Sequence, residues 1–110
     1  MSIKLSGATG PYAEFINGTY TSAEERLNGK TVYLKRGDDS LCLFFAADSQ
    51  WWVAVTTEAK AGMLAGYAHT EVGVPHPTLA TQWRVGDGKG GAMLQTMVSS
   101  VMVSLLDFLC

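Results

Sequence analysis

Frequent turn signals divide the first ninety residues into short apolar runs, and this spacing constrains the fold more than any other feature. The strongest signals are Asn17-Gly18 and Asn28-Gly29, because Asn and Gly tolerate the positive φ of tight hairpin turns. The chain has 12 glycines in 110 residues, which is above the average usage of about 7%. This pattern predicts many tight turns between short elements.

Within these runs the apolar residues alternate with polar ones or are β-branched and aromatic, which is typical of strands. The polar connection between residues 41–45 and 51–55 indicates a hairpin, and residues 23–26 suit one helical turn. The expected strands are residues 3–5, 31–34, 41–45, 51–55, 63–68 and 81–85. The predicted fold is therefore mainly β, a small antiparallel barrel or sandwich of about five to seven (5–7) short strands.

The apolar period changes at Ala92. From there to Cys110 the apolar residues recur every fourth position, which predicts an amphipathic C-terminal α-helix. The domain prediction is a β-rich module over residues 1–91 and this helix over residues 92–110, packed on the sheet within the same domain. Pairing of the helix with a second copy, giving a homodimer, is an open alternative. A membrane span is disfavoured, because it needs about 20 mainly apolar residues and this segment includes six polar ones.

Charge and cysteine content exclude several classes of protein. Eight Lys and Arg against ten Asp and Glu leave a net charge of −2, which argues against a nucleic-acid partner. The residues are 47% hydrophobic and 16% charged, unlike a disordered segment. Residues 1–10 do not read as a secretory signal, and the two cysteines exclude a disulfide framework. These observations predict a single cytoplasmic domain.

One glycine-rich motif resembles a phosphate-binding loop. Residues 86–91 read Gly-x-Gly-x-x-Gly after a predicted strand, the setting in which glycines admit a pyrophosphate. However, only 19 residues follow Gly91, which leaves no room for a βαβ unit. We therefore expect a turn here. A small enzyme or nucleotide-binding protein that combines this glycine loop with His69 or His76 is kept as an alternative.

The remaining candidates for chemistry are few. His69 and His76 lack neighbouring cysteines at zinc-site spacing. Cys42 lies in an apolar run that predicts a buried, unreactive thiol, although folding could bring it to a histidine. No catalytic, cofactor-binding or metal-binding residue is predicted, and the protein is predicted not to be an enzyme.

The aromatic residues are the candidates for a binding surface. An exposed ring could stack on a sugar, a proline or a base. Adjacent residues of a strand point to opposite faces, so only one of Trp51 and Trp52 can enter a one-sided core, and the sequence leaves open which one. The predicted ligand-binding residues are Tyr33, Trp51, Trp52 and Trp83.

The order of motifs resembles a β-rich, tryptophan-containing module of algal and other protist proteins, which often occurs as tandem repeats. The resemblance covers residues 3–89, about four-fifths of the chain, and departs from the pattern where the predicted helix replaces a further strand. It implies a structural or binding role and transfers no catalytic residue. The motifs that carry it are Asn17-Gly18-Thr19-Tyr20, Asn28-Gly29-Lys30-Thr31-Val32-Tyr33, Trp51-Trp52-Val53, Gly66-Tyr67-Ala68, Pro77 and Trp83-Arg84-Val85-Gly86-Asp87-Gly88.

We therefore expect a non-catalytic structural or binding module that recognises a protein or a small molecule through exposed aromatics. Two alternatives remain: the small enzyme or nucleotide-binding protein with the glycine loop, and a scaffold unit that self-associates through residues 92–110.

Overall fold

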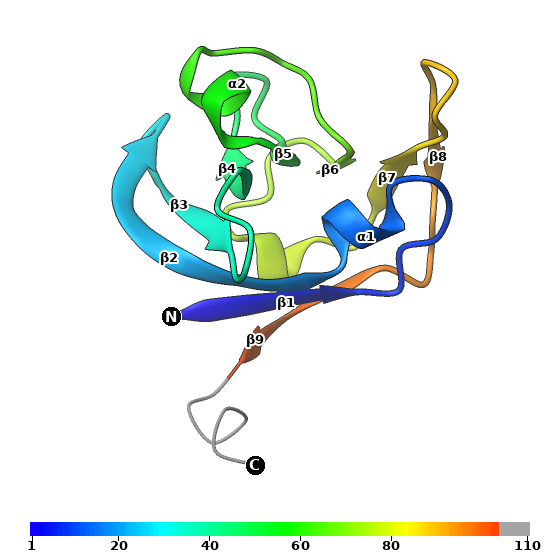
Figure 1. Ribbon diagram of the computed structural model, residues 1–110, viewed down its shortest axis with the longest axis horizontal. Helices are drawn as coiled ribbons and strands as arrows, with labels where there is room; N and C mark the ends of the chain where they lie inside the picture. The colour runs from blue at the N-terminus through cyan, green and yellow to red at the C-terminus, as the bar shows by residue number, and fades with distance from the viewer. Residues whose placement is uncertain (104–110) are drawn as a thin grey trace.

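A computed structural model describes residues 1–103 and shows one antiparallel sheet of nine strands that curls around a core (Figure 1). The strand order is β8-β7-β6-β5-β4-β3-β2-β1-β9. Chain neighbours pair from β1 to β8, and β9 returns to pair with β1. The mainly β, antiparallel prediction is confirmed.

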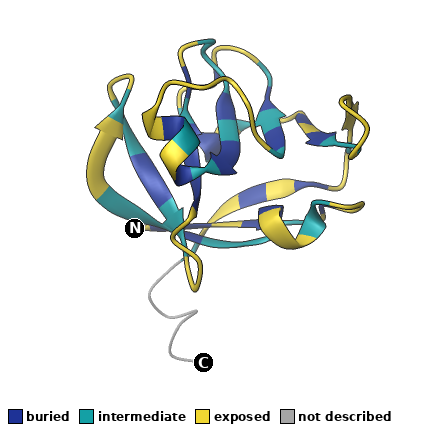
Figure 2. Ribbon diagram, turned by 45° about the horizontal axis from the view of Figure 1, so that its top comes forward, coloured by how far each residue is buried: buried dark blue, intermediate teal, exposed yellow. Residues whose placement is uncertain are grey.

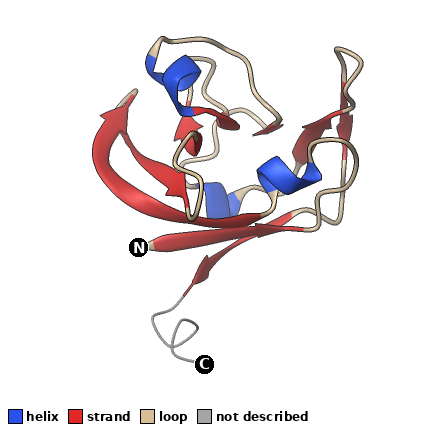
Figure 3. Cartoon of the chain, in the orientation of Figure 1, coloured by secondary structure: helices blue, strands red, loops and turns tan. Residues whose placement is uncertain are grey.

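The strands are short, and three small helical segments lie between them (Figure 3). The strands are β1 (Ser2–Ser6), β2 (Gly18–Leu27), β3 (Lys30–Lys35), β4 (Leu41–Phe45), β5 (Trp51–Val55), β6 (Ala68–Thr70), β7 (Trp83–Gly86), β8 (Ala92–Leu94) and β9 (Ser99–Val103). The helices are α1 (Ala13–Ile16), α2 (Thr56–Lys60) and the 3-10 helix η1 (Pro77–Leu79). None of them is long and apolar enough to cross a membrane.

The concave side of the sheet holds the main core, and buried residues line it along most strands (Figure 2). Alternate residues of most strands point inward, as the pleat requires, whereas β8 is exposed along its length. The largest fully buried side chains include Trp51, Trp83 and Tyr20. The Tyr20 hydroxyl donates to the carbonyl of Ile16 at 2.7 Å, so this buried polar group is paired.

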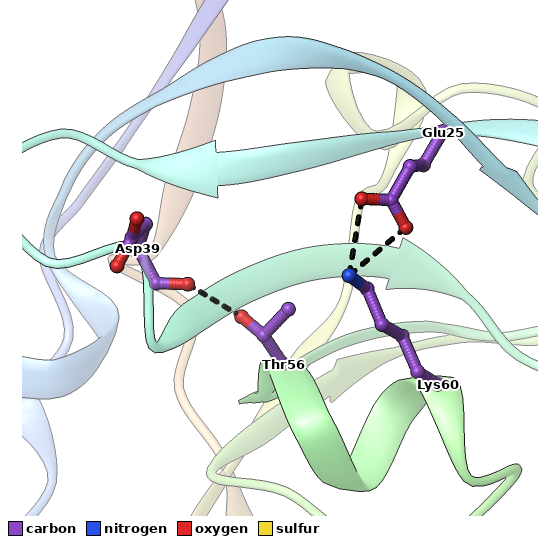
Figure 4. A network of polar contacts seen from close by, with 4 residues as sticks. All are labelled: Glu25, Asp39, Thr56 and Lys60. Carbon is purple, nitrogen blue, oxygen red and sulfur yellow. Dashed lines mark hydrogen bonds and ion pairs between the residues drawn. The ribbon is translucent and has the colours of Figure 1, made fainter.

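A second apolar cluster lies on the other side of β3, β4 and β5, under α2. It includes Val32, Cys42, Phe44 and Ala59. Figure 4 shows how both ends of α2 are held. Thr56 Oγ1 donates to the carbonyl of Asp39, in the turn between β3 and β4, at 2.9 Å, and Lys60 Nζ lies 3.0 Å from Glu25 on β2. Residues of β4 and β5 are therefore covered on both faces.

Residues 95–98 join the two ends of the sheet. The Gln95 side chain donates to the Thr9 carbonyl and accepts from the Thr9 amide, at 3.0 and 2.9 Å. Its own backbone N–H donates to the carbonyl of Trp83 at 3.0 Å. Val98 enters the core. The segment from β8 to β9 thus connects the β7 end of the sheet to the β1 end.

The predicted C-terminal helix is wrong over residues 92–103, which form β8 and β9. β9 pairs with β1 over five residue pairs, so the segment satisfies backbone groups that would otherwise remain at an open sheet edge. Pairing with the rest of the sheet outweighs the four-residue apolar period here, and β-branched Val101 and Val103 suit a strand. The rest of the predicted helix, residues 104–110, lies outside the described residues.

The expected count of 5–7 strands is also wrong, because β8 and β9 were assigned to that helix and β2 was not among the expected strands. Residues 23–26 continue β2 and form no helical turn, and the strand expected at 63–68 begins only at Ala68. Membership of the resembled protist module family stays a prediction.

Candidate functional site

The structure separates the four predicted binding aromatics. Trp51 and Trp83 are buried in the core at 2% and 1% exposure, and Tyr33 is buried at 4%. Tyr33 and Trp51 lie together, with ring centroids 6.3 Å apart. Trp52 is half-buried on the opposite face of β5, which settles which tryptophan enters the core. Of the four, only Trp52 offers a substantial surface to a ligand.

Trp52 lies in a row of side chains that crosses three strands. Trp52 on β5 is the register partner of His69 on β6, and His69 is the partner of Arg84 on β7. Directly opposed residues of antiparallel strands share a face. The three side chains therefore stand side by side, on the face opposite the core residues Trp51, Ala68 and Trp83.

These three residues form the floor of a pocket of about 290 Å³, which we name the Trp52 pocket. Its volume is near the lower end of the range for small-molecule sites. Ala65 and Gly66 line it from the segment before β6, and Gly90 and Gly91 from the loop before β8. The pocket therefore brings His69 and the glycine loop together, as the enzyme or nucleotide-binding alternative requires.

Trp52 and His69 form a stacked pair with fixed orientations. Their ring centroids are 4.6 Å apart with an interplanar angle of 32°. The Trp52 indole N–H donates to the Asp48 carboxylate, at 2.9 Å to the nearer oxygen. His69 Nδ1 lies 3.1 Å from the carbonyl of Thr70, so Nδ1 carries the proton and Nε2 is the acceptor of the neutral ring. The pair is a preorganised aromatic surface.

Arg84 provides the positive charge of the pocket. Its side chain is exposed, and among residues 1–103 no hydrogen bond or ion pair holds its guanidinium. A planar guanidinium binds carboxylate or phosphate through two parallel hydrogen bonds. Arg84 is therefore available to an anionic group of a ligand that rests on the Trp52–His69 surface.

Gly66 lets the segment before β6 lie close to Trp52. A Cβ atom at this position would lie 2.4 Å from the carbonyl oxygen of Val53 and 3.1 Å from Cε3 of Trp52. Any side chain here would push the segment away from the sheet, because real Cβ contacts are not this short. The narrow wall of the pocket therefore depends on glycine at this position.

The glycine loop contributes a wall and not a phosphate cradle. The Asp87 carboxylate accepts from the amides of Lys89 and Gly91, at 2.7 and 3.1 Å. A carboxylate of the chain itself thus occupies the donors that an anion would need. In addition, β8 and β9 follow the loop in place of the helix whose N-terminus would favour a phosphate.

The other candidates for chemistry lie apart. His76 bonds to Tyr33 and Thr78, and no hydrogen bond within residues 1–103 joins either histidine to Cys42. Burial raises the pKa of the Cys42 thiol to about 11, so little reactive thiolate forms near neutral pH. The described contacts therefore give no activated nucleophile.

Sequence reasoning missed Arg84 as a binding residue. The available signal was the alternation Trp83-Arg84-Val85, which places the arginine opposite two apolar side chains on a strand. Its position beside His69 depends on the β6–β7 register, which the sequence pattern does not specify.

Comparisons with protein-family models, with curated proteins and with solved structures give no significant match.

Proposed function

We propose that the protein is a non-catalytic binding module and that the Trp52 pocket takes a small ligand with a planar ring and an anionic group. One observation carries the proposal: the stacked Trp52–His69 pair lies beside Arg84, whose charge has no partner in residues 1–103. An aromatic surface favours a flat group with an accessible π face, and the arginine favours a negative charge next to it. The resemblance to a protist module without assigned catalysis agrees with such a role.

The alternative functions keep less support. For the enzyme or nucleotide-binding alternative, the Trp52 pocket does unite His69 with Gly90 and Gly91, but Asp87 occupies two amides of the loop. For the self-associating scaffold, residues 92–103 pair with β7 and β1 of their own chain. The homodimer stays a prediction without the helix on which it was based.

The proposal is tested with three probes that separate the ring from the charge. Adenosine monophosphate carries both, adenosine carries only the ring, and ribose phosphate carries only the charge. We expect adenosine monophosphate to bind at least about tenfold more tightly than either of the others, a difference of roughly 1.4 kcal/mol. Calorimetry measures the affinities, and quenching of Trp52 fluorescence locates the ligand.

Two variants with one matched control complete the test. Arg84→Gln should weaken the binding of adenosine monophosphate about tenfold and leave that of adenosine nearly unchanged. Trp52→Phe should remove the fluorescence response. Arg36→Gln, the same substitution at an exposed arginine outside both the Trp52 pocket and the phosphate-binding site proposed below, should do neither. Equal affinities for adenosine monophosphate and adenosine, or equal effects of the two arginine variants, would refute the proposal.

A further inference from the structure

A second pocket, of about 210 Å³, lies where the β2–β3 turn faces the loop before η1. We name it the His76 pocket. Its lining includes Arg26, Lys30, Tyr33, Trp51 and His76. It is separate from the Trp52 pocket, because Trp51 and Trp52 point to opposite faces of β5.

Hydrogen bonds in this pocket leave one proton donor, the part-buried hydroxyl of Tyr33, without an acceptor from the described residues. The backbone N–H of Thr78 donates to His76 Nδ1 at 3.3 Å, so the neutral ring carries its proton on Nε2. Nε2 lies 3.3 Å from the Tyr33 hydroxyl oxygen and therefore donates to it. No acceptor within residues 1–103 takes the remaining O–H of Tyr33, which faces the pocket.

The charges around this donor are all positive. Lys30 and Arg26 line the pocket, and no carboxylate of the described residues does. Arg26 Nη1 donates to the carbonyl of Gly29 at 3.2 Å, which holds the guanidinium at the turn. Lys30 Nζ lies 5.3 Å from the Phe45 ring centroid and has no ion-pair partner among residues 1–103. Two cations thus gather at one pocket of a chain with net charge −2.

We propose that the His76 pocket binds a small oxyanion of the phosphate type, which accepts the Tyr33 O–H and is paired with Lys30 and Arg26. An oxyanion supplies the acceptor that the Tyr33 hydroxyl lacks and the negative charge that the two cations lack. His76 is a positioning residue here, because its Nε2–H occupies one side of the Tyr33 oxygen and directs the hydroxyl proton away from itself. The inference does not depend on the function proposed for the Trp52 pocket.

Burial, with the charge of Lys30 acting on His76, keeps these two groups in the required protonation states. Burial, and then the charge of Lys30, lower the pKa of His76 below its usual 6.5, so the ring is neutral at neutral pH. Burial raises the pKa of Tyr33 above 10, so the hydroxyl keeps its proton. A bound oxyanion would offset the repulsion from Lys30, and the pKa of His76 should then rise.

The experiment titrates the full chain with inorganic phosphate and with sulfate while NMR follows the two histidine rings. His76 reports this pocket, and His69 reports the Trp52 pocket independently. We expect a saturable shift of the His76 signals with either anion and a rise in the pKa of His76. Chloride at equal ionic strength should produce neither. The absence of a saturable His76 shift would overturn the proposal.

Matched variants assign the contacts. Lys30→Met and Tyr33→Phe should each weaken phosphate binding at His76 about tenfold, whereas Lys4→Met, at an exposed lysine on β1, should leave it unchanged. Arg26→Gln, a surface substitution that preserves the core, should weaken binding severalfold even if Tyr33→Phe unfolds the chain. Equal phosphate affinity in Lys30→Met, Arg26→Gln and Lys4→Met would also overturn the proposal.

Discussion

The two buried tryptophans differ in one hydrogen bond. The Trp51 indole N–H donates to the carbonyl of Val74 at 2.9 Å. The indole N–H of Trp83 is buried and has no partner among the described residues. An unpaired buried donor costs free energy, whereas a paired one contributes to stability. Trp51 therefore fastens the segment before His76 to the core, while Trp83 contributes through its volume alone.

We accordingly predict that Trp51→Phe destabilises the fold more than Trp83→Phe, by roughly 1–2 kcal/mol. Both changes remove a similar volume from the core, but only Trp51→Phe leaves the Val74 carbonyl without its donor. Urea unfolding followed by circular dichroism measures both free energies. Equal losses, or a larger loss for Trp83→Phe, would contradict this assignment.

At the residue scale the sequence predicted well which side chains of a strand face opposite ways, and it predicted their hydrogen-bond partners poorly. The strand pattern indicated that Trp51 and Trp52 face opposite ways, and the structure confirms it. It did not indicate that Asp48 would hold the Trp52 ring or that Thr78 would orient His76. Such contacts depend on turn geometry, and a short pattern of residue types does not specify turn geometry.

Among the connecting elements, the segment between β8 and β9 does the most to hold the fold together. It lies against residues 7–9 of the opposite sheet end, where Gly7 has a φ of +89°. A Cβ atom on Gly7 would lie only 2.0 Å from the carbonyl oxygen of Met97. The contact between the β8–β9 segment and residues 7–9, which closes the curled sheet, therefore requires a residue without a side chain at position 7.

Gly7→Ala should therefore destabilise the fold by roughly 3 kcal/mol or more. Gly10→Ala is the matched control, since Gly10 has a φ of +97° and no atom within 4 Å of the added Cβ. It should cost about 1–2 kcal/mol, the backbone strain alone. Denaturant unfolding gives both values, and hydrogen exchange in β9 shows whether closure is lost. Similar costs for the two variants would mean that the close approach does not limit the closure.

The same segment explains why the prediction of a C-terminal helix failed. Apolar residues every fourth position satisfy a helix, but Val98 and Ser100 also alternate as buried residues with exposed Ser99 and Val101. The four-residue apolar period alone did not decide between a helix and a strand. The decisive factor was the unpaired edge of β1, which a chain-local pattern does not show.

At the scale of the whole molecule, curling of the sheet makes one chain present two different surfaces. The concave face contains the core, and parts of the convex face beyond α2 remain open for the Trp52 pocket. The turn spacing was sufficient to predict a curled antiparallel sheet. The two pockets were not predictable, because each combines segments whose register and spacing arise only on closure.

The whole fold should be most stable near neutral pH. On the alkaline side the raised pKa values of three buried groups outweigh the lowered pKa of Lys35, and on the acid side the shifts are downward. Burial raises the pKa of Cys42 from about 9 to about 11 and also raises those of Tyr20 and Tyr33. A raised pKa gives stability that is present below the unfolded value and lost as pH rises. The free energy of unfolding should therefore fall from about pH 9 upward.

Lowered pKa values act on the acid side of neutral pH. Burial, then Lys30, lower the pKa of His76. Burial would raise the pKa of Glu71, but bonds from the Thr81 hydroxyl, at 2.6 Å, and from backbone amides outweigh it and lower the pKa. A lowered pKa gives stability that is present above the unfolded value and lost as pH falls. The loss should begin below pH 6.5 through His76 and continue below pH 4.5 through Glu71.

Two substitutions separate these contributions in a chain whose second cysteine is removed by Cys110→Ser. Cys42→Ala should flatten the alkaline decline between pH 9 and 11, to which the thiol contributes roughly 2–3 kcal/mol. Glu71→Gln should flatten the acid decline below pH 4.5 and leave the alkaline side unchanged. Urea unfolding at each pH gives the profiles. If Cys42→Ala keeps the parental alkaline slope, the thiol is not held in its neutral form by the apolar cluster under α2.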